Sequence, residues 1–562
     1  MTSPTSPLPG EPDRDAATAV ALGGEVVGAL DPLDPLQMVE SLARTVRPDA
    51  VMRAGGRVMA GLAQVLIGRS DVEIPKRDVR FRDPTWSDNG LFRRLAQGYL
   101  LWAGEMMKLV ENDEVDWRTR ERSRFLMTVL TSFPAPSNNP LSNPEVLKRV
   151  LETGGSSVLD GLGNLLRDLA DNGGLPAQVR MSAFELGKDL AASPGAVVHR
   201  TEMFEILQYS PTTETVRDTP LLLLPPPVNK YYFWDLAPGR SMIEYVVGRG
   251  LTVFTMVWRD PKPGHGGWGI EDYVRAQVEA VDVARDIAGT SEVHVFGDCS
   301  GGLFASLLLG YEAATGGGRL RSATLGVTVL DMGQPSGVGM TASDRALRGV
   351  RQRAAKGEVI SAADITSTFV WMRPDDLVWR YVINNWMLGK EPPAFDVLYW
   401  NSDGQGLPSQ LALDLTRISL DNSLTRPGAL SVLGVPIDLS MVKADVYAIA
   451  GKTDHISPWK ACYATTQMLG GTTEFVLTPT GHVQSIIYPP TNPKASFWTG
   501  AEPVHDPDTW LARATRNQGS WWPHWVDWLI ERSGAERPAR SELGNARHLA
   551  GEPAPGRYVR GE

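Results

Sequence analysis

The chain has 562 residues, of which 42% are hydrophobic and 21% charged, a composition typical of a globular protein with room for two or three domains. Its net charge of −10 argues against a general nucleic-acid binder, and no apolar run approaches the roughly 20 residues that a transmembrane helix requires. Because only Cys299 and Cys462 are present, no disulfide framework is expected and a cytosolic chain is favoured.

The N-terminal segment shows no pattern of a packed element. Residues 1–20 are polar, Pro-rich and acidic, and they lack the basic start and apolar core of a signal peptide. Such a composition buries too little apolar surface to offset the entropy lost on folding. We therefore interpret 1–30 as a disordered lead-in and 1–80 as a variable, partly disordered segment.

The next part of the chain has a helical pattern. Within 91–110 and 143–169, apolar residues recur three and four positions apart, as on one face of an α-helix. Asn143–Pro144 followed by an acidic residue is a typical helix start. We expect a mainly helical N-terminal domain over 81–205.

The remaining residues, 206–562, are expected to form an α/β catalytic domain. Short aliphatic and β-branched runs alternate with helical stretches such as 271–289, whose valines share one face. This alternation predicts a doubly wound sheet, because parallel strands require helical crossovers. The expected buried strands are 221–225, 251–258, 292–296, 323–331, 444–451 and 473–482.

The alternation stops before the last two expected strands. Residues 333–440 are rich in Trp, Asn, Pro and Leu and show no strand series. An interruption at this place indicates a cap inserted into the sheet domain. Four tryptophans make it a candidate apolar lid: Trp371, Trp379, Trp386 and Trp400.

The stretch GDCSGG, 297–302, carries the candidate nucleophile. It fits the elbow pattern G-x-nucleophile-x-G between a strand and a helix, where α/β-hydrolases place a reactive serine. Here the central residue is Cys299. Ser300 is the weaker candidate, because that register places Asp298 where a small residue is needed. Cys462 lies in a helix-like stretch without an elbow and is interpreted as a structural thiol.

The general base and its acid are expected after the two following strands. In hydrolase triads the order along the chain is nucleophile, acid, histidine. Asp454 is the only carboxylate in the loop after 444–451, and His482 follows the next strand. His455 is the alternative base, but it adjoins the acid and lies one strand too early, so a supporting hydrogen-bonding role is expected for it.

An oxyanion hole needs two backbone N–H groups that point at the developing charge. One is expected from Ser300, the residue after the nucleophile. The other should come from the loop PPPVN, whose three prolines have no N–H to donate. Val228 is the first residue of that loop with an N–H, and Asn229 is the second.

Tryptophans gather near the C-terminus, with four in the stretch GSWWPHWVDWL, 519–529. Aromatic side chains dominate core burial, so we interpret this stretch as a C-terminal helix packed against the core. The alternative is an apolar surface for a lipid-like product or a partner.

Together these segments resemble the poly(3-hydroxyalkanoate) synthases of the long-chain kind, class I or II. The family's elbow G-x-C-x-G-G is similar to GDCSGG, and its acid and base loops are similar to DHISPW and GHVQSIIYPP. Further matches include PPPVNKYYFWDLAPGRS and VWRDPKPGHGGWGIEDYV, and the similarity runs from about residue 80 to the C-terminus.

The resemblance implies an α/β-hydrolase core with a cap, preceded by a helical N-terminal domain. Carried over position by position, the family's catalytic cysteine falls on Cys299, its aspartate on Asp454 and its histidine on His482. It implies transfer of (R)-3-hydroxyacyl groups from coenzyme A to a growing polyester. The thioester is the substrate, and no cofactor, metal or second subunit type is expected. A homodimer in the cytoplasm on polymer granules is implied, while the residues that bind coenzyme A cannot be named.

The sequence departs from the family close to the thiol. Asp298 and Ser300 stand where an aromatic and an aliphatic residue are usual, and Leu303 replaces a threonine. Ser485 and Tyr488 replace a common glycine and asparagine in the base loop. These changes leave two alternatives open: a thioesterase or esterase with the same triad, and an inactive granule-associated scaffold.

Overall fold

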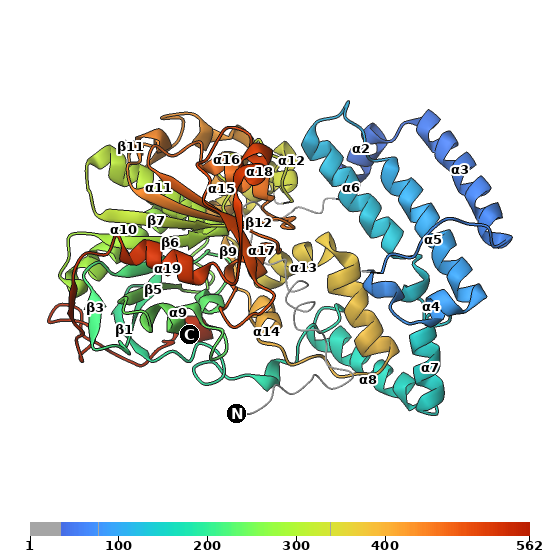
Figure 1. Cartoon of the computed structure of the whole chain (residues 1–562), viewed down its shortest axis with the longest axis horizontal. Coiled ribbons are helices and arrows are strands. Elements are labelled where there is room, and N and C mark those ends of the chain that lie inside the picture. The colour runs from blue at the N-terminus through green and yellow to red at the C-terminus, as the bar shows by residue number, and fades with distance from the viewer. Residues whose placement is uncertain (1–34, 77, 338) are drawn as a thin grey trace. The chain divides into compact units, whose positions relative to one another are not determined.

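The computed structural model describes residues 35–76, 78–337 and 339–562 (Figure 1). The expected disordered lead-in therefore lies outside the described residues. Among the described residues, none of the helices is both long and apolar enough to cross a membrane.

The described chain forms two compact units. The first, the sheet unit, comprises Met181–Thr366 and Phe395–Glu562. The second, the helical unit, comprises the described part of Asp31–Arg180 together with Ser367–Ala394. The chain thus leaves the sheet unit once, contributes a short segment to the helical unit, and returns.

These units differ from the expected domain boundaries. Two helices fall within the segment 1–80 that was expected to be variable, and they belong to the helical unit. The helical unit ends at Arg180 rather than near residue 205. The expected cap, 333–440, is divided between the two units, because 367–394 packs with the helices. The functional division into domains stays a prediction.

A ten-stranded mixed sheet forms the centre of the sheet unit (Figure 1). The six middle strands, β5 to β13, are parallel, and the strands at both edges are antiparallel. In spatial order the strands are β1 (Gly195–Arg200), β2 (Phe204–Tyr209), β5 (Val253–Trp258), β4 (Leu221–Leu224), β6 (Val293–Asp298), β7 (Leu320–Gly326), β12 (Asp445–Gly451), β13 (Thr473–Thr478), β14 (Ser496–Thr499) and β15 (Thr515–Gln518).

The parallel strands lie where the sequence predicts them, with one shift. β7 begins at Leu320, ahead of the expected 323–331, and ends at Gly326. It ends there because Val327 has a positive φ of 41°, outside the extended region. The hairpin of β1 and β2 was not predicted, since part of it was assigned to the helical domain. All of β2 is buried, so it lacks the polar alternation that marks a half-exposed strand.

Helices cover both faces of the sheet. On β12, Tyr447 contacts Trp528 of α19 (Trp522–Ile530), whereas the next residue, Ala448, packs with Tyr463 of α16 (Trp459–Thr465). Successive side chains of a strand point to opposite faces, so α19 and α16 lie on opposite sides. The other covering helices are α9 (Met242–Val247), α10 (Ile270–Ala288) and α11 (Cys299–Thr315).

Between β7 and β12 the chain adds no strand to the main sheet over the described residues. The helices of this insertion are α12 (Asp344–Ala355), α13 (Ala362–Met372), α14 (Asp396–Ser402) and α15 (Ser409–Asp421), with π-helical turns at Asp375–Trp379 and Val382–Met387. Small strand pairs are β8 (Val359–Ile360) with β9 (Leu407–Pro408), and β10 (Ser431–Val432) with β11 (Val435–Pro436). Elsewhere in the sheet unit, β3 (Thr215–Arg217) pairs with β16 (Glu536–Pro538). Two short helices also belong to this unit, α17 (His482–Ile486) and α18 (Pro507–Arg513).

The helical unit is built from helices of 4 to 19 residues. Its α-helices are α2 (Pro35–Thr45), α3 (Pro48–Leu66), α4 (Thr85–Asp88), α5 (Gly90–Lys108), α6 (Trp117–Ser132), α7 (Pro144–Glu152) and α8 (Ser156–Asp171). Among them, α2 packs with α6 and α3 packs with α5. The expected helix start is confirmed: Asn143 Oδ1 accepts hydrogen bonds from the backbone N–H groups of Glu145 and Val146. The expected helical stretch 143–169 is broken in two, because Gly154 and Gly155 both take positive φ.

Candidate active site

Cys299 stands at the sharp turn between β6 and α11, with a positive φ of 47°. A side-chain-bearing residue in this region is strained by about 1–2 kcal/mol, as is usual where a structure fixes a reactive group. The flanking glycines make the turn possible. A Cβ at Gly297 would lie 2.4 Å from the carbonyl oxygen of Gly301, so only glycine fits there. The elbow predicted from the sequence is therefore present in geometry.

The proline loop after β4 lies against the same turn. A Cβ at Gly301 would lie 2.5 Å from the carbonyl oxygen of Leu224 and 3.0 Å from the nitrogen of Pro226. Val228 is 1% exposed, as is Ser300. Thus the two peptides expected to form the oxyanion hole come from segments that meet at the elbow. Their role as donors stays a prediction.

Asp454 and His482 meet directly at the ends of β12 and β13. Nδ1 of His482 lies 2.7 Å from Asp454 Oδ2, and both side chains are buried. The parallel pairing of β12 and β13 explains the contact, because residues that follow neighbouring parallel strands emerge at the same edge of the sheet. Because His482 makes this bond to the acid, the geometry fits the first-choice base.

The other carboxylate oxygen of Asp454 is held by the backbone. Oδ1 accepts hydrogen bonds from the N–H groups of Ile456 at 2.8 Å and Ser457 at 2.9 Å. These donors were not predicted, although an aspartate that bonds the amides two and three residues ahead is a common turn motif. Both oxygens are satisfied, so the carboxylate is fixed in orientation toward the imidazole.

The environment favours a charged imidazole at His482. Burial lowers its pKa, but the charges of Asp454 and Cys299, together with hydrogen bonds to both, raise it, and the net effect is a pKa well above the usual value. The buried carboxylate at 2.7 Å is the physical reason for this direction. An imidazolium beside Cys299 in turn stabilises the thiolate form of that side chain.

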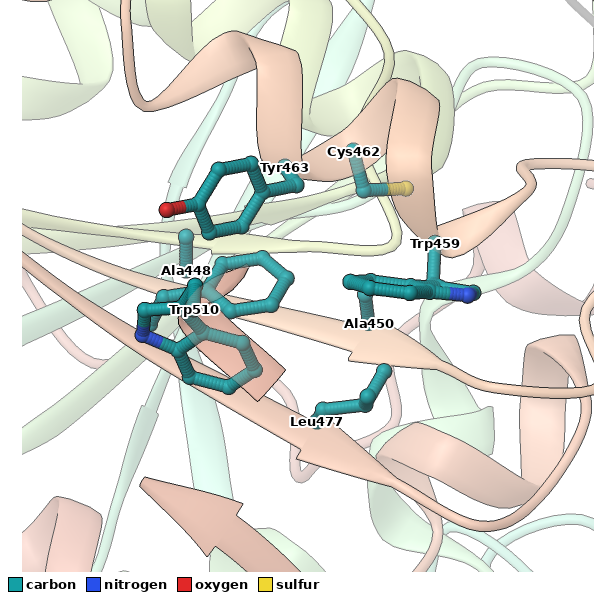
Figure 2. Close-up of a cluster of buried hydrophobic side chains, with 8 residues drawn as sticks. Ala448, Ala450, Trp459, Cys462, Tyr463, Leu477 and Trp510 are labelled. Atoms are coloured by element: carbon teal, nitrogen blue, oxygen red, sulfur yellow. The ribbon is translucent and has the colours of Figure 1, made fainter. Parts of the chain in front are cut away.

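The second cysteine has the surroundings of a core residue. Figure 2 shows Cys462 on α16, above Ala450 and Leu477 and between Tyr463 and Trp459. Its thiol donates to the Ser457 carbonyl at 3.3 Å, and burial raises its pKa well above the usual value. A thiol of this kind is a poor nucleophile, in agreement with the structural interpretation.

The positions that depart from the family are all buried around the elbow and the base loop. The hydroxyl of Ser485 lies 2.6 Å from the Gly481 carbonyl oxygen and 2.7 Å from the Thr478 hydroxyl. A Cβ at Gly451 would lie 2.4 Å from this hydroxyl, so a neighbouring glycine makes space for it. The buried set comprises Asp298, Ser300, Leu303, Ser485 and Tyr488.

The four tryptophans of the expected lid are divided between the two units. Trp400 is fully buried in the sheet unit, where its indole N–H donates to the Lys230 carbonyl at 2.7 Å. The other three, Trp371, Trp379 and Trp386, lie in the helical unit. Their role as a lid stays a prediction.

Two protein-family models together match most of the chain. A family model described as "Poly-beta-hydroxybutyrate polymerase (PhaC) N-terminus" matches residues 77–246, and one described as "alpha/beta hydrolase fold" matches residues 227–487. The α/β-hydrolase fold with a helical N-terminal region is thereby confirmed.

Curated relatives cover almost the same length. Poly(3-hydroxyalkanoate) polymerase 1 of Ectopseudomonas oleovorans is 44% identical over 498 residues, which cover 89% of each chain. Polymerase 2 of the same organism is 43% identical over 89% of each chain. The poly(3-hydroxyalkanoate) polymerase subunit PhaC of Cupriavidus necator is 39% identical, over 88% of this chain and 85% of its own.

Proposed function

The chain belongs to the poly(3-hydroxyalkanoate) polymerase family, a family of acyltransferases, and from that premise we propose that it joins (R)-3-hydroxyacyl groups into a polyester through a thioester at Cys299. One observation carries the assignment of the residues: Asp454 bonds His482 at 2.7 Å inside a buried site, and the charge of Cys299 acts on the same imidazole. Acid, base and nucleophile thus lie near enough for each charge to influence the next.

The first step is a thioester exchange. The thiolate of Cys299 attacks the carbonyl carbon of the acyl-coenzyme A, a new carbon–sulfur bond forms, and the coenzyme A thiolate leaves and takes a proton from His482. The bond broken and the bond formed are both thioesters, so the acyl group stays activated. A serine would instead trap the group as a more stable oxygen ester.

The second step forms the ester bond. The hydroxyl at position 3 of a second acyl-coenzyme A attacks the thioester carbonyl carbon at Cys299, and His482 accepts the hydroxyl proton as general base. The carbon–sulfur bond to Cys299 breaks, so the thiolate of Cys299 leaves and the lengthened chain stays on coenzyme A until the next thioester exchange. Asp454 orients the imidazole and stabilises its charged form. The backbone N–H groups of Ser300 and Val228 are the proposed donors to the oxyanion in both steps. The buried surroundings of Cys299 favour this transfer over hydrolysis, since an acyl-enzyme survives only where water is excluded.

The family resemblance extends the proposal to the surroundings of the enzyme. A homodimer bound to a polyester granule, with no second type of subunit, is the proposed working form. The insertion between β7 and β12 is the proposed cap that limits the access of water.

The test supplies purified protein with (R)-3-hydroxybutyryl-CoA and, separately, a longer (R)-3-hydroxyacyl-CoA. Thiol release and the acyl product are both measured, with the Cys299→Ala protein in parallel. We expect thiol release with insoluble polyester from the parent protein only. Release of free hydroxy acid alone would identify a thioesterase instead, the alternative that the buried Asp298 and Ser300 beside the thiol keep open.

A further inference from the structure

The helix that carries the base is too short to hold its own position. α17 spans only His482–Ile486, and His482 is its first residue. A helix of five residues is unstable alone, because the first turn costs more entropy than its single hydrogen bond returns. Its last carbonyl oxygens have no partner within the helix. The position of the His482 backbone therefore depends on groups outside α17.

Two tryptophans at the start of α19 supply partners for these carbonyls. Nε1 of Trp521 donates to the Ser485 oxygen at 2.7 Å, and Nε1 of Trp522 donates to the Ile486 oxygen at 2.9 Å. Trp521 is 0% exposed and Trp522 is 1% exposed, so no water can replace either indole N–H. A buried carbonyl that loses its donor is costly, which makes these two bonds strong constraints.

The tryptophans are themselves fixed to the sheet. The ring of Trp521 packs against the ring of Tyr447 on β12, with centroids 6.2 Å apart. The Ser520 hydroxyl accepts from the backbone N–H of Trp522 at 3.0 Å and donates to the Tyr488 carbonyl beyond α17. The two indoles thus connect α17 to the rigid centre of the sheet unit.

We infer that Trp521 and Trp522 are positioning residues for the reaction at Cys299, because they hold the end of α17 and so keep the His482 imidazole in place between Asp454 and the thiol. This inference rests on the proposed function for its meaning in catalysis. The structural part of the inference does not depend on the substrate: the position of His482 relative to Cys299 depends on two distant indole N–H groups.

A matched control lies on the same helix. Trp525 is as deeply buried as Trp521 and also donates its indole N–H, but to β7 rather than to α17. Replacement of tryptophan by phenylalanine removes the N–H and keeps an aromatic ring. Trp525→Phe therefore reproduces the loss of packing and of one buried hydrogen bond without touching α17.

The experiment measures the alkylation rate of Cys299 by iodoacetamide against pH. A Cys462→Ala background leaves Cys299 as the sole thiol, and Trp521→Phe, Trp522→Phe and Trp525→Phe are compared in it, with the melting temperature of each. We expect Trp521→Phe and Trp522→Phe to slow alkylation at pH 7 about tenfold and to move the profile up by roughly one pH unit, because a displaced imidazolium no longer stabilises the thiolate. Trp525→Phe should keep the parent dependence of the alkylation rate on pH, even if its melting temperature falls as much as those of Trp521→Phe and Trp522→Phe.

The same variants are then assayed with (R)-3-hydroxybutyryl-CoA, where a loss in kcat with little change in KM is expected for Trp521→Phe and Trp522→Phe only. An unchanged alkylation profile in both variants would overturn the inference, as would an equal shift in Trp525→Phe. If one of the two variants does not fold, the other decides. Because alkylation needs no acyl substrate, failure of polymer synthesis in the parent protein would count against the proposed function and leave this test intact.

Discussion

Individual residues at the candidate site combine a strained cysteine with a fixed carboxylate and imidazole. Cys299 holds a positive φ that the glycines around it permit, and the carboxylate of Asp454 is bonded on both oxygens. The residue types and their order along the chain predicted this group, because a nucleophile, an acid and a histidine follow successive strands. The indoles that hold α17 are not visible in the sequence, since they come from a segment 36 residues away, whereas the amides that hold Asp454 belong to a local turn.

Removal of the charge on Asp454 tests the orientation of the base. In Asp454→Asn the imidazole loses the carboxylate that stabilises its charged form, so we expect kcat to fall about 10³-fold or more with little change in KM. Asp445→Asn is the control, because Asp445 lies at the other end of β12, where it pairs with Arg532 at 3.0 Å. Steady-state thiol release measures both. Equal activity of the two variants would remove Asp454 from the mechanism.

A buried histidine outside the site gives a pH prediction. His294 lies inside β6 between the hydroxyls of Ser322 at 2.7 Å and Ser533 at 3.0 Å. Burial lowers its pKa to about 3, and the positive charges of Arg321 and Arg532 act in the same direction. The unfolded chain binds this proton near pH 6.5, so His294 leaves stability intact above pH 6.5 and reduces it as the pH falls toward 3.

We therefore expect the parent protein to lose about 2–3 kcal/mol of unfolding free energy between pH 6.5 and pH 4.5 relative to His294→Gln, which has no titrating ring. Denaturant unfolding at the two pH values measures this difference. Each protein's stability at pH 6.5 serves as its own reference, so any packing cost of glutamine cancels. Parallel loss in both proteins would show that His294 does not titrate in this range.

The secondary-structure elements were predictable to different degrees. The buried parallel strands and the start of α7 follow from short aliphatic runs and a helix-capping asparagine. Periodicity alone does not say which face of a helix is buried. In α8 the polar side is buried, where Asn164 donates to the carbonyls of Asn385 and Lys390 at 2.9 and 3.0 Å. The leucines of the same helix are exposed: Leu159, Leu162, Leu166 and Leu169.

Two glycines of α8 test this packing. A Cβ at Gly161 would lie 1.9 Å from the backbone oxygen of Trp386, whereas nothing lies within 4 Å of a Cβ at Gly163. We expect Gly161→Ala to destabilise the helical unit by about 1–3 kcal/mol through the displaced backbone. Gly163→Ala should stabilise it by about 0.5–1 kcal/mol through the higher helix propensity of alanine. Thermal unfolding of both variants measures this contrast, and two changes of the same sign would contradict the described packing.

At the scale of the whole molecule, the helical unit is built from two stretches of chain that are far apart in the sequence. The segment Ser367–Ala394 was expected to belong with the insertion of the sheet domain, but it packs within the helical unit, where Trp386 donates to Asp168 at 2.7 Å. The sequence could not predict this, because the partners are more than 200 residues apart. The sheet unit, by contrast, contains every residue proposed for chemistry.

The measurement that tests the central claim most directly is the mass of the acyl-enzyme. The protein is mixed with (R)-3-hydroxybutyryl-CoA, quenched in acid within the first turnovers and digested, and the peptides that carry Cys299 and Cys462 are weighed. The account predicts hydroxyacyl mass on the Cys299 peptide alone, and none in Cys299→Ala. Turnover with an unmodified Cys299 peptide, or acylation of Cys462 instead, would contradict it.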